Sequence, residues 1–553
     1  MTKKEQIANL IFPNIHSTID DLEKRYPKRN LPKDAIVSRF APSPTGFLHT
    51  GSLFTSLVSA RFAHQTDGIF YIRLEDTDQK REVKGSGEKV FEQLKIFKIN
   101  PDEGYLKGGE YSPYIQSQRK EIYHIVIKEM IIKGIAYPCF CSHEELDETR
   151  KFQEKNKLLP GYYGNFARCR KLNDDEVISK IKNGDSYVIR FKSNGSPDNK
   201  VDLYDAIRGH IQFPENILDV VIMKSDLLPT YHFAHVVDDH FMRTTHVTRG
   251  EEWMSSVPIH LELFKALGFV SPIYCHLPVI MKLDNGKRRK LSKRKDLEAS
   301  VDYFLEQGYP IEGFLEYLMT LANSNFEEWR INHPNNDIFD FKLSFDKMSF
   351  DGALFDIEKI KSISKERLAY MNKDEFTKNA YDYAKIYSPE LKDIIDRNPE
   401  YFKSIINIER EQEKPRKDYE KYSDILNVID FMYDDYYNKL FNAGLNFNQR
   451  FTKEQIIEIL EEYKINNGLD LSQDEWFANM KKLALNKGFA ARGKDFKKNP
   501  DKYIGTIGDY AEILRLATCA KKNTPNFYFV LKILGEKRMA NRIEKTIHFL
   551  KNN

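Results

Sequence analysis

The strongest constraint on the fold of this chain is a strand–loop–helix–strand pattern between residues 35 and 76. Residues 35–40 are a short β-prone run, and two prolines and a glycine in the next six residues (APSPTG) require an ordered loop. From His49 onward, apolar residues recur four positions apart, which indicates a helix. Residues 68–76 then have the composition of a strand that ends in acidic residues. This order indicates a βαβ unit and therefore a parallel sheet.

Strand patterns continue only to about residue 300. A second β-prone block comprises residues 220–223, 236–237 and 246–249, which we expect to be strands. After it, Glu, Lys, Leu and Ile recur at helical spacing to the C-terminus, without a repeat or a low-complexity tract. A chain of 553 residues has room for roughly three or four domains. We therefore expect a multidomain protein with an α/β half followed by an all-α half.

Composition excludes several classes of protein. Hydrophobic residues make up 41% of the chain and charged residues 30%, which is typical of a globular protein rather than a disordered one. No stretch approaches the roughly 18 uninterrupted apolar residues of a membrane helix, and the N-terminus lacks the apolar core of a signal peptide. The five cysteines are too few for a disulfide scaffold. We expect a cytoplasmic protein without a membrane anchor.

The charge is distributed unevenly along the chain. The net charge is +3, but residues 481–553 contain 17 Lys and Arg against 6 Asp and Glu. A basic C-terminal segment on a mildly acidic body fits an end that binds a polyanion. A lysine-rich solvated surface would have the same composition, so charge alone does not decide between the two.

A motif that suits phosphate binding stands where the predicted loop meets the helix, at His49-Thr50-Gly51-Ser52. A helix N-terminus presents unpaired N–H groups and the positive end of a dipole, which together bind phosphate. Gly51 would let the backbone approach a nucleotide closely, and His49 would add a donor where phosphate charge develops. Taken by itself, the tetrapeptide is also compatible with an ordinary capped helix.

A second motif is the basic segment 287–295, in which seven of nine residues are Lys or Arg. It contains Lys290-Leu291-Ser292-Lys293-Arg294. Mobile ammonium groups can neutralise the charge that grows on phosphoryl oxygens and on a pyrophosphate leaving group. Without further context, the segment could equally be a solvated loop or a general polyanion patch.

Four segments in this order resemble class I aminoacyl-tRNA synthetases, and specifically bacterial-type glutamyl-tRNA synthetases: residues 39–46 (RFAPSPTG), 49–52 (HTGS), 73–78 (RLEDTD) and 290–294 (KLSKR). The resemblance covers about residues 36–553, and its motifs are strongest in the first half. It implies a Rossmann-like parallel-sheet catalytic domain with an insertion. The implied activity is that of a glutamate–tRNA ligase, which uses ATP and Mg²⁺ to activate L-glutamate and transfers the glutamyl group to the terminal adenosine of tRNA(Glu).

The resemblance also assigns roles to single residues. For ATP it implies His49, Gly51, Ser52, Glu252 and Lys293, and for catalysis His49, Lys290 and Lys293. For glutamate it implies Arg39 and Arg249 at the side-chain carboxylate, Ser43 and Glu75 at the ammonium group, and Tyr231 and His235 in the pocket wall. Arginine suits a carboxylate because its planar fork can bond both oxygens. Two positions depart from the commonest pattern: Ser52 replaces a histidine, and His235 stands where some relatives have asparagine.

Three cysteines raise the question of zinc. Some relatives bind zinc in the inserted domain through Cys-x-Cys and a later Cys-x-His, and this chain has Cys139, Cys141 and Cys169. The position two after Cys169 is Lys171, so a tetrahedral site lacks its expected last ligand. Tyr163 or His143 could replace it. We favour unliganded cysteines and therefore no metal, with zinc as the alternative.

The resemblance divides the chain into successive parts: an N-terminal extension (1–35), the first half of the catalytic domain (36–138), an inserted connective or acceptor-binding domain (139–215), the second half of the catalytic domain (216–300), a stem-contact helical domain (301–375) and an α-helical anticodon-binding domain (376–553). We expect a monomer. The alternatives are a glutaminyl-tRNA synthetase, a truncated paralogue that modifies a tRNA base, and a noncatalytic RNA-binding protein descended from a synthetase.

Overall fold

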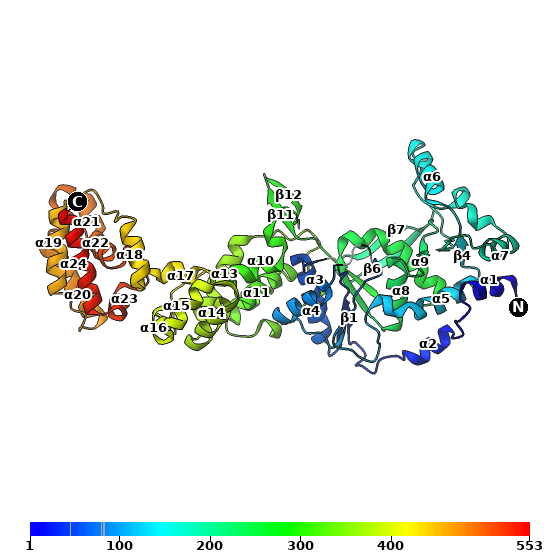
Figure 1. The fold of residues 1–553 in the computed structure, drawn as a ribbon, viewed down its shortest axis with the longest axis horizontal. Helices are drawn as coiled ribbons and strands as arrows, with labels where there is room; N and C mark the ends of the chain where they lie inside the picture. The colour runs from blue at the N-terminus through cyan, green and yellow to red at the C-terminus, as the bar shows by residue number, and fades with distance from the viewer. Residues whose placement is uncertain (45, 79, 81–82, 293, 553) are drawn as a thin grey trace. The chain divides into compact units, whose positions relative to one another are not determined.

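A computed structural model describes the chain except for residues 45, 79, 81–82, 293 and 553 (Figure 1). The chain divides into two compact units. The first contains residues 1–303 and 315–356, and the second contains residues 304–314 and 357–553. Sheets and helices alternate in the first unit, whereas the second is mainly helical. The expected succession of an α/β half and a helical half is therefore confirmed.

The predicted βαβ unit is present in the first unit. It consists of β1 (Val37–Phe40), α3 (Thr50–His64) and β2 (Ile69–Ile72), and β1 pairs with β2 in parallel. Strand β3 (Glu103–Gly104) extends this sheet beside β2. The turn from α3 into β2 requires Gly68, because a Cβ atom there would lie 2.0 Å from the carbonyl oxygen of Ile36.

A second sheet adjoins the first. It has the order β7-β6-β10-β9, formed by β6 (Lys200–Asp205), β7 (Gly209–Pro214), β9 (His246–Gly250) and β10 (Ile273–Leu277). Strand β10 is parallel to β9 and to β6, while β6 and β7 form an antiparallel hairpin. The amide of Thr245 donates to the carbonyl oxygen of Val37 at 2.9 Å, which links the two sheets.

The prediction of a strand at residues 236–237 is wrong. Both valines lie in α8 (Tyr231–Phe241), and both are fully buried. Phe233, Val236, Val237 and Phe241 recur at helical spacing and pack into the same core. A pair of β-branched residues is too short a signal to outweigh that longer period. The predicted strands around it are present as β8 (Val221–Met223) and β9.

The segment between the two halves of the sheet system forms its own layer. Strands β4 (Ala136–Cys139), β5 (Val188–Phe191) and β8 make an antiparallel sheet, next to α6 (His143–Lys155) and α7 (Asp174–Lys182). The hairpin β6–β7, which follows β5 in this segment, is not part of this layer, because β6 pairs with β10 of the second sheet.

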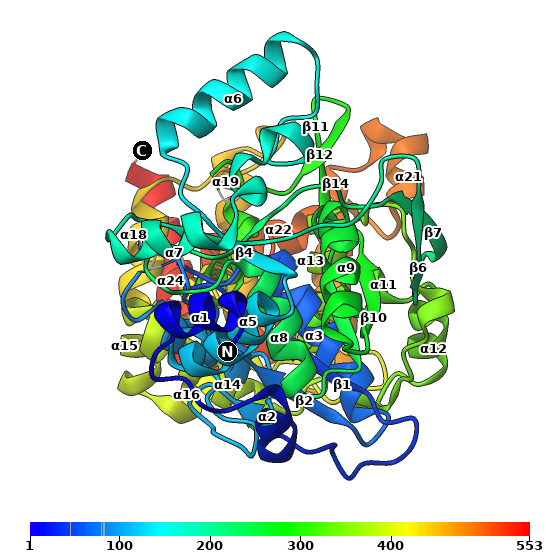
Figure 2. The same ribbon diagram turned by 90° about the vertical axis from the view of Figure 1, so that its right-hand side faces the viewer.

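The N-terminal extension is part of the packed core. Helix α1 (Lys3–Ile11) lies against α5 (Lys120–Ile132) and α7, and α2 (Ile19–Arg25) also contacts α5 (Figure 2). Ile7, Ile11 and Phe12 are buried there. The extension therefore contributes to the folding of the first unit rather than acting only as a linker.

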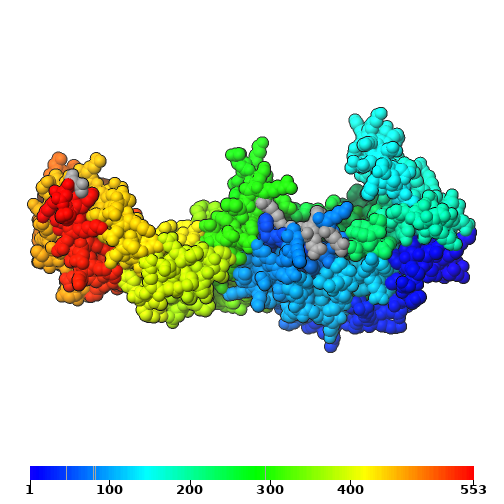
Figure 3. Space-filling model, in the orientation of Figure 1, coloured from blue at the N-terminus to red at the C-terminus, as the bar shows by residue number. Residues whose placement is uncertain are grey.

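The basic segment begins as a hairpin instead of a loop. Strands β11 (Met281–Asp284) and β12 (Lys287–Lys290) pair antiparallel around Asn285 and Gly286, which have φ angles of 50° and 76°. Asn-Gly is the usual sequence of such two-residue turns. The hairpin projects from the surface in Figure 3, and the motif Lys290-Leu291-Ser292 begins at the last residue of its second strand.

The remaining helices of the first unit are α4 (Ser86–Ile96), α9 (Val257–Leu267) and α12 (Phe326–Asn332), and α10 (Val301–Gln307) and α11 (Ile311–Ala322) run across the unit boundaries. The second unit contains α13 (Ile357–Tyr370), α14 (Lys373–Tyr387), α15 (Pro389–Arg397), α16 (Pro399–Ile406), α17 (Asp424–Ile429), α18 (Asp434–Asn442), α19 (Lys453–Ile465), α20 (Gln473–Asn486), α21 (Gly493–Lys498), α22 (Ile507–Cys519), α23 (Phe527–Leu534) and α24 (Glu536–Asn552), with the short strands β13 (Phe489–Ala490) and β14 (Gly505–Thr506). A continuous apolar core joins these helices except α21. None of the helices built from described residues has both the length and the apolar character needed to cross a bilayer.

Candidate active site

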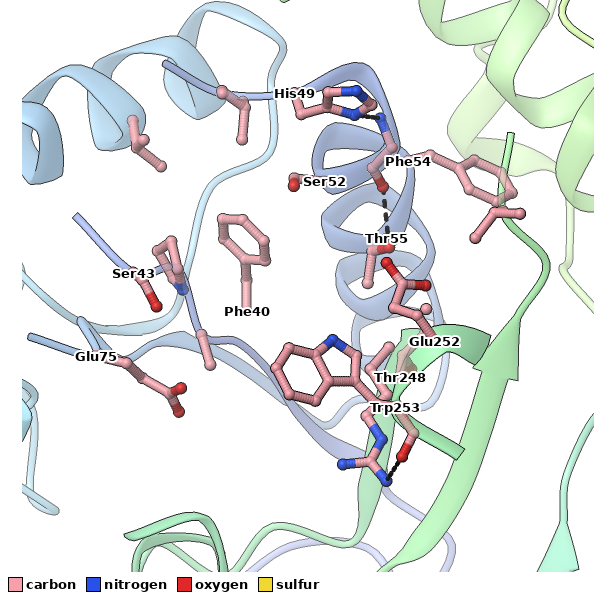
Figure 4. A pocket seen from close by; sticks show the side chains of 18 of the residues that line it. Phe40, Ser43, His49, Ser52, Phe54, Thr55, Glu75, Thr248, Glu252 and Trp253 are labelled. Atoms are coloured by element: carbon pink, nitrogen blue, oxygen red, sulfur yellow. Dashed lines mark hydrogen bonds between the residues drawn. The ribbon is translucent and has the colours of Figure 1, made fainter. Parts of the chain in front are cut away.

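A cavity of about 800 Å³ opens at the carboxyl ends of β1, β2, β9 and β10 (Figure 4). This edge of a parallel sheet system is where α/β proteins bind their ligands. Most of the residues predicted for the site line it: Arg39, Ser43, His49, Gly51, Ser52, Glu75, Tyr231, Arg249, Glu252 and Lys290. Lys293 lies outside the described residues. His235 is not among the lining residues.

The helix N-terminus at one end of the cavity has the expected form. His49 is the N-cap of α3, and its Nδ1 atom accepts a hydrogen bond of 2.9 Å from the amide of Gly51. A neutral imidazole that accepts at Nδ1 carries its proton at Nε2. The side chain therefore caps the helix and keeps a donor at its other nitrogen. Figure 4 shows His49 and Ser52 together at this end of α3.

The two sequence motifs meet although about 240 residues separate them. The hydroxyl of Thr50 donates to the carbonyl oxygen of Glu298 at 2.7 Å, and the amide of Val301 donates to that of Leu48 at 3.3 Å. The segment that follows the basic loop is thus bonded to the residues on both sides of His49.

Lys290 projects into the cavity from the end of β12. Its ammonium group lies 2.8 Å from the Oε1 atom of Glu252. Burial by itself would raise the pKa of Glu252, but the hydrogen bond and the charge of Lys290, together with a backbone hydrogen bond and nearby His49, hold that pKa below its ordinary value. The ammonium group of Lys290 and the carboxylate of Glu252 therefore lie together at the end of the cavity where α3 begins.

Asp296 anchors the loop that carries the second motif. It accepts two hydrogen bonds from Arg289, at 2.6 and 2.8 Å, and one from the amide of Ser292 at 2.8 Å. Lys282 lies 3.3 Å away on the other strand of the hairpin. The hydrogen bonds from Arg289 hold the pKa of Asp296 well below its usual range. The loop therefore leaves the hairpin in a fixed direction.

The opposite end of the cavity rests on a buried ion network. The Nε atom of Arg39 lies 3.3 Å from both oxygens of Asp239, and Arg73 donates to Asp239 at 2.7 Å and to Glu75 at 3.0 Å. Arg73 and Asp239 are completely buried. Burial raises the pKa of Glu75, and the nearby arginines oppose that rise. In Figure 4, Ser43 and Glu75 lie on the same side of the cavity, where an ammonium group would find two oxygen acceptors.

Arg249 faces the cavity from β9. Its guanidinium group donates to the hydroxyl of Tyr231 at 3.1 Å, to the carbonyl oxygen of Trp253 at 3.3 Å and to the Nε2 atom of His276 at 3.0 Å. It is 5% exposed. A buried guanidinium at the cavity wall is suited to a carboxylate ligand, because its planar fork can bond both oxygens.

His235 supports the cavity wall instead of lining it. It is fully buried behind Tyr231, with the two rings stacked at 6.0 Å. Its Nε2 atom bonds the hydroxyl of Tyr274 at 2.9 Å, and its Nδ1 atom lies 2.7 Å from Asp239. Burial lowers the pKa of His235 to about 4, so the ring is neutral under ordinary conditions.

Several residues of the site were missed by the sequence analysis. Trp253 lines the cavity against Tyr231, with ring centroids 4.6 Å apart. Asp239 was also missed, although two adjacent acids in the apolar segment 233–242 signal a buried ion network. For His276 the sequence offers no signal, and its strand β10 was not predicted either.

A separate cluster in the inserted layer brings three thiols together. The Sγ atoms of Cys139, Cys141 and Cys169 lie within 4.8 Å of one another. The hydroxyl of Tyr162 is 3.3 Å from the sulfur of Cys141, so Tyr162 lies at the thiols rather than the Tyr163 or His143 considered from the sequence. A hydrogen bond from Cys169 lowers the pKa of Cys139 to about 4. Three cysteine sulfurs this close together correspond to three of the four ligands of a tetrahedral zinc site.

Comparison with known proteins identifies the relatives of this chain. The family described as class I tRNA synthetases (E and Q), catalytic domain, matches residues 35–360. The glutamate–tRNA ligase of Clostridium perfringens (strain 13 / Type A) is 45% identical over 98% of this chain and 100% of its own length. That of Acetivibrio thermocellus is 43% identical with the same coverage. The crystal structure of a glutamate tRNA ligase from Elizabethkingia meningosepticum in complex with its amino acid covers 93% of this chain and 99% of its own chain, with 28% identity and a TM-score of 0.75.

The buried histidine predicts how acid affects stability. The pKa of His235 is about 4 in the folded chain against an ordinary value of 6.5, so between these values the unfolded chain binds more protons. The free energy of unfolding should therefore decrease as the pH falls from 6.5 towards 4. His235→Asn cannot titrate and should show a smaller decrease.

The measurement is thermal unfolding across this pH range. His143→Asn is the control, because His143 is exposed at the start of α6, and it should follow the wild-type curve. Parallel curves for wild type and His235→Asn would contradict the prediction.

Proposed function

This chain belongs to the glutamate–tRNA ligase family of class I tRNA synthetases, and we propose from the geometry of the cavity how its residues carry out that reaction. The chain uses ATP to activate glutamate and joins the glutamate to tRNA. The assignment of roles rests on one observation. A single cavity has the N-terminus of α3, suited to phosphate, and Lys290 at one end, and two buried arginines at the other. The three substrates are ATP, L-glutamate and tRNA(Glu).

In the first step, the α-carboxylate of glutamate attacks the α-phosphorus of ATP. The new bond joins a carboxylate oxygen to that phosphorus, and pyrophosphate leaves with the electrons of the broken P–O bond. ATP enters as its Mg²⁺ complex, which shares the phosphate charge. The Nε2–H group of His49 and the ammonium groups of Lys290 and Lys293 stabilise the charge that develops on the phosphates. No side chain is required as a nucleophile.

Glu252 has two roles in this scheme. It holds Lys290 through the 2.8 Å ion pair, and it stands where the ATP ribose would offer hydroxyl donors. When phosphates enter, Lys290 can exchange its carboxylate partner for phosphate oxygens, and Glu252 is then available to the ribose. Gly250 permits this placement, because a Cβ atom there would lie 2.1 Å from a carboxylate oxygen of Glu252.

The glutamate end of the cavity favours an acid over an amide. Arg39 and Arg249 would bond the side-chain carboxylate, while Ser43 and Glu75 would accept from the ammonium group. A glutamine side chain would leave buried guanidinium charge uncompensated, which is costly. This argument, together with the glutamate–tRNA ligase relatives, favours glutamate over the glutaminyl alternative.

In the second step, the terminal adenosine of tRNA takes the glutamyl group from the adenylate. A ribose hydroxyl oxygen forms the ester bond, AMP leaves, and the hydroxyl proton passes to solvent or to the leaving phosphate. Catalysis in both steps is then positioning and charge stabilisation.

The second unit contains a cavity that suits an RNA base. Its volume is about 480 Å³, and it is lined by four aromatic side chains, Trp476, Phe477, Phe527 and Tyr528, together with Arg416 and Arg515. Single-stranded RNA is read by stacking of splayed bases on aromatic rings and guanidinium planes. The basic charge of residues 481–553 would attract the backbone. We assign this cavity to a base of the anticodon loop, in the helical part expected to bind the anticodon.

Although unliganded cysteines were expected from the sequence, the approach of the three thiols leads us to propose the alternative, a structural zinc ion at this cluster. Cys139, Cys141 and Cys169 would supply three sulfur ligands, and the hydroxyl of Tyr162, next to Cys141, is placed to approach the fourth position. The ion would tie β4 to the short helical segment Arg168–Lys171 within the inserted layer. It would take no part in the reaction.

The overall function is tested by charging purified tRNA(Glu) and tRNA(Gln) with labelled glutamate and ATP, with labelled glutamine as control. Glutamate on tRNA(Glu) is the expected result, and charging of neither tRNA would contradict the proposal. In a separate measurement of ATP–pyrophosphate exchange, Lys293→Ala should reduce the rate on the order of 10²-fold or more, while tRNA affinity stays unchanged. Lys287→Ala, an exposed residue of the same basic segment, should leave exchange intact.

The base cavity predicts a separable effect on tRNA binding. Phe477 is 51% exposed, so Phe477→Ala should fold, and loss of stacking should weaken tRNA binding about 10-fold. The KM values for ATP and glutamate at saturating tRNA should not change. Tyr370→Ala is the control, because Tyr370 is a similarly exposed ring of the same unit, at 59%, and does not line the cavity. Equal tRNA affinities for wild type and Phe477→Ala would contradict the assignment.

The zinc assignment is tested by elemental analysis of protein purified without chelator. We expect about one zinc per chain, and its loss in Cys169→Ser together with a lower unfolding temperature. Cys519→Ala, which removes a thiol of the second unit, should retain the metal. A wild-type protein without zinc would show that the three thiols are unliganded.

A further inference from the structure

The two arginines of the pocket differ in how their charge is balanced. Arg39 lies 3.3 Å from Asp239, so its charge is matched within the protein. Arg249 donates instead to an imidazole, a hydroxyl and a carbonyl oxygen. Within the described part of the chain, no carboxylate forms an ion pair with Arg249. A buried charge without a partner is costly, so this guanidinium is prepared for an anion that enters from outside.

The side chain of Arg249 is held in place by His276. The two residues stand opposite each other in the parallel pair β9–β10, and the Nε atom of Arg249 lies 3.0 Å from the Nε2 atom of His276. On the other side, the Nδ1 atom of His276 lies 2.7 Å from Asp205 at the end of β6. His276 and Asp205 are completely buried. Three neighbouring strands thus supply a chain of hydrogen bonds that ends at the substrate pocket.

The chemistry of arginine fixes the protonation of this chain. A guanidinium has donors and no acceptor, so the Nε2 atom of His276 must carry a lone pair. The ring proton then lies on Nδ1 and is donated to Asp205. Burial lowers the pKa of His276, although the hydrogen bond to Asp205 opposes this. The imidazole is therefore neutral: it orients Arg249 without neutralising its charge.

We propose that His276 is a positioning residue for substrate selection: it aims the guanidinium of Arg249 at the side-chain carboxylate of glutamate and leaves the positive charge of Arg249 for that carboxylate alone. A carboxylate in the place of His276 would orient Arg249 equally well but would cancel its charge. Asp205 acts one step further back and fixes the tautomer of the ring. The inference rests on the proposed function of the cavity and adds a residue that contacts no substrate.

Two substitutions that differ by one methylene test the proposal. His276→Asn can still donate to Asp205, but its side chain is too short to accept from Arg249. His276→Gln can place an amide oxygen where Nε2 lies. We expect His276→Asn to raise the KM for glutamate about 10- to 100-fold, to leave the KM for ATP unchanged and to reduce discrimination against glutamine. His276→Gln should restore most of the glutamate affinity.

The assay is charging of tRNA(Glu) by the full chain, with thermal unfolding of each variant measured in parallel. An unchanged KM for glutamate in His276→Asn, or KM values for glutamate and ATP that rise together, would overturn the proposal. If His276→Asn does not fold, His276→Leu is compared with His276→Gln under the same criteria. Failure of the wild type to charge glutamate would instead refute the proposed function, so the two failures are distinguishable.

Discussion

The first unit depends on the placement of Asp239 between Arg39 and Arg73. Its carboxylate is completely buried, and the two guanidinium groups hold its pKa well below the ordinary value even though burial alone would raise it. Removing either partner would leave an uncompensated charge in the core, which costs several kcal/mol. The network ties β1, the end of β2 and α8 together, and it fixes Arg39 at the cavity. The same buried ion network therefore holds these elements together and fixes the position of a positive charge in the pocket.

Local patterns were sufficient for the parts of the site that lie close together in sequence. The prolines and glycine before His49, the apolar period of α3 and the acidic end of β2 predicted a βαβ unit with a phosphate site, and the structure contains that unit. The Asn285-Gly286 pair is also typical of a hairpin turn, and a hairpin is present. The basic residues around the pair favoured the prediction of a loop instead. The prediction of a strand at residues 236–237 was wrong for a different reason. Two adjacent β-branched residues are too few to show the alternation of apolar and polar residues that marks a strand.

The parts that could not be predicted depend on pairings between distant segments. His276 becomes significant only because β10 lies between β9 and β6, an order that no local pattern contains. His235 was expected at the glutamate, yet its neighbours on α8 turn it behind Tyr231, where it contacts Asp239 instead. Tyr162 approaches the cysteines from a turn whose path the sequence does not specify. Residue type indicates chemistry, whereas the partner of a buried group is decided by topology.

The hairpin β6–β7 has a consequence for how such proteins can be recombined. By sequence it is the tail of the inserted segment, but its strand β6 pairs with β10 and ends at Asp205, which bonds His276. An exchange of the whole insertion between two relatives would therefore also exchange the group that sets the tautomer behind the substrate pocket. The layer of β4 and β5 is completed only by β8, which follows the hairpin, so an exchange that spares the pocket has to leave residues 200–214 in place. The exchangeable module is therefore two stretches of chain that together form the β4–β5–β8 layer, without the hairpin β6–β7 between them.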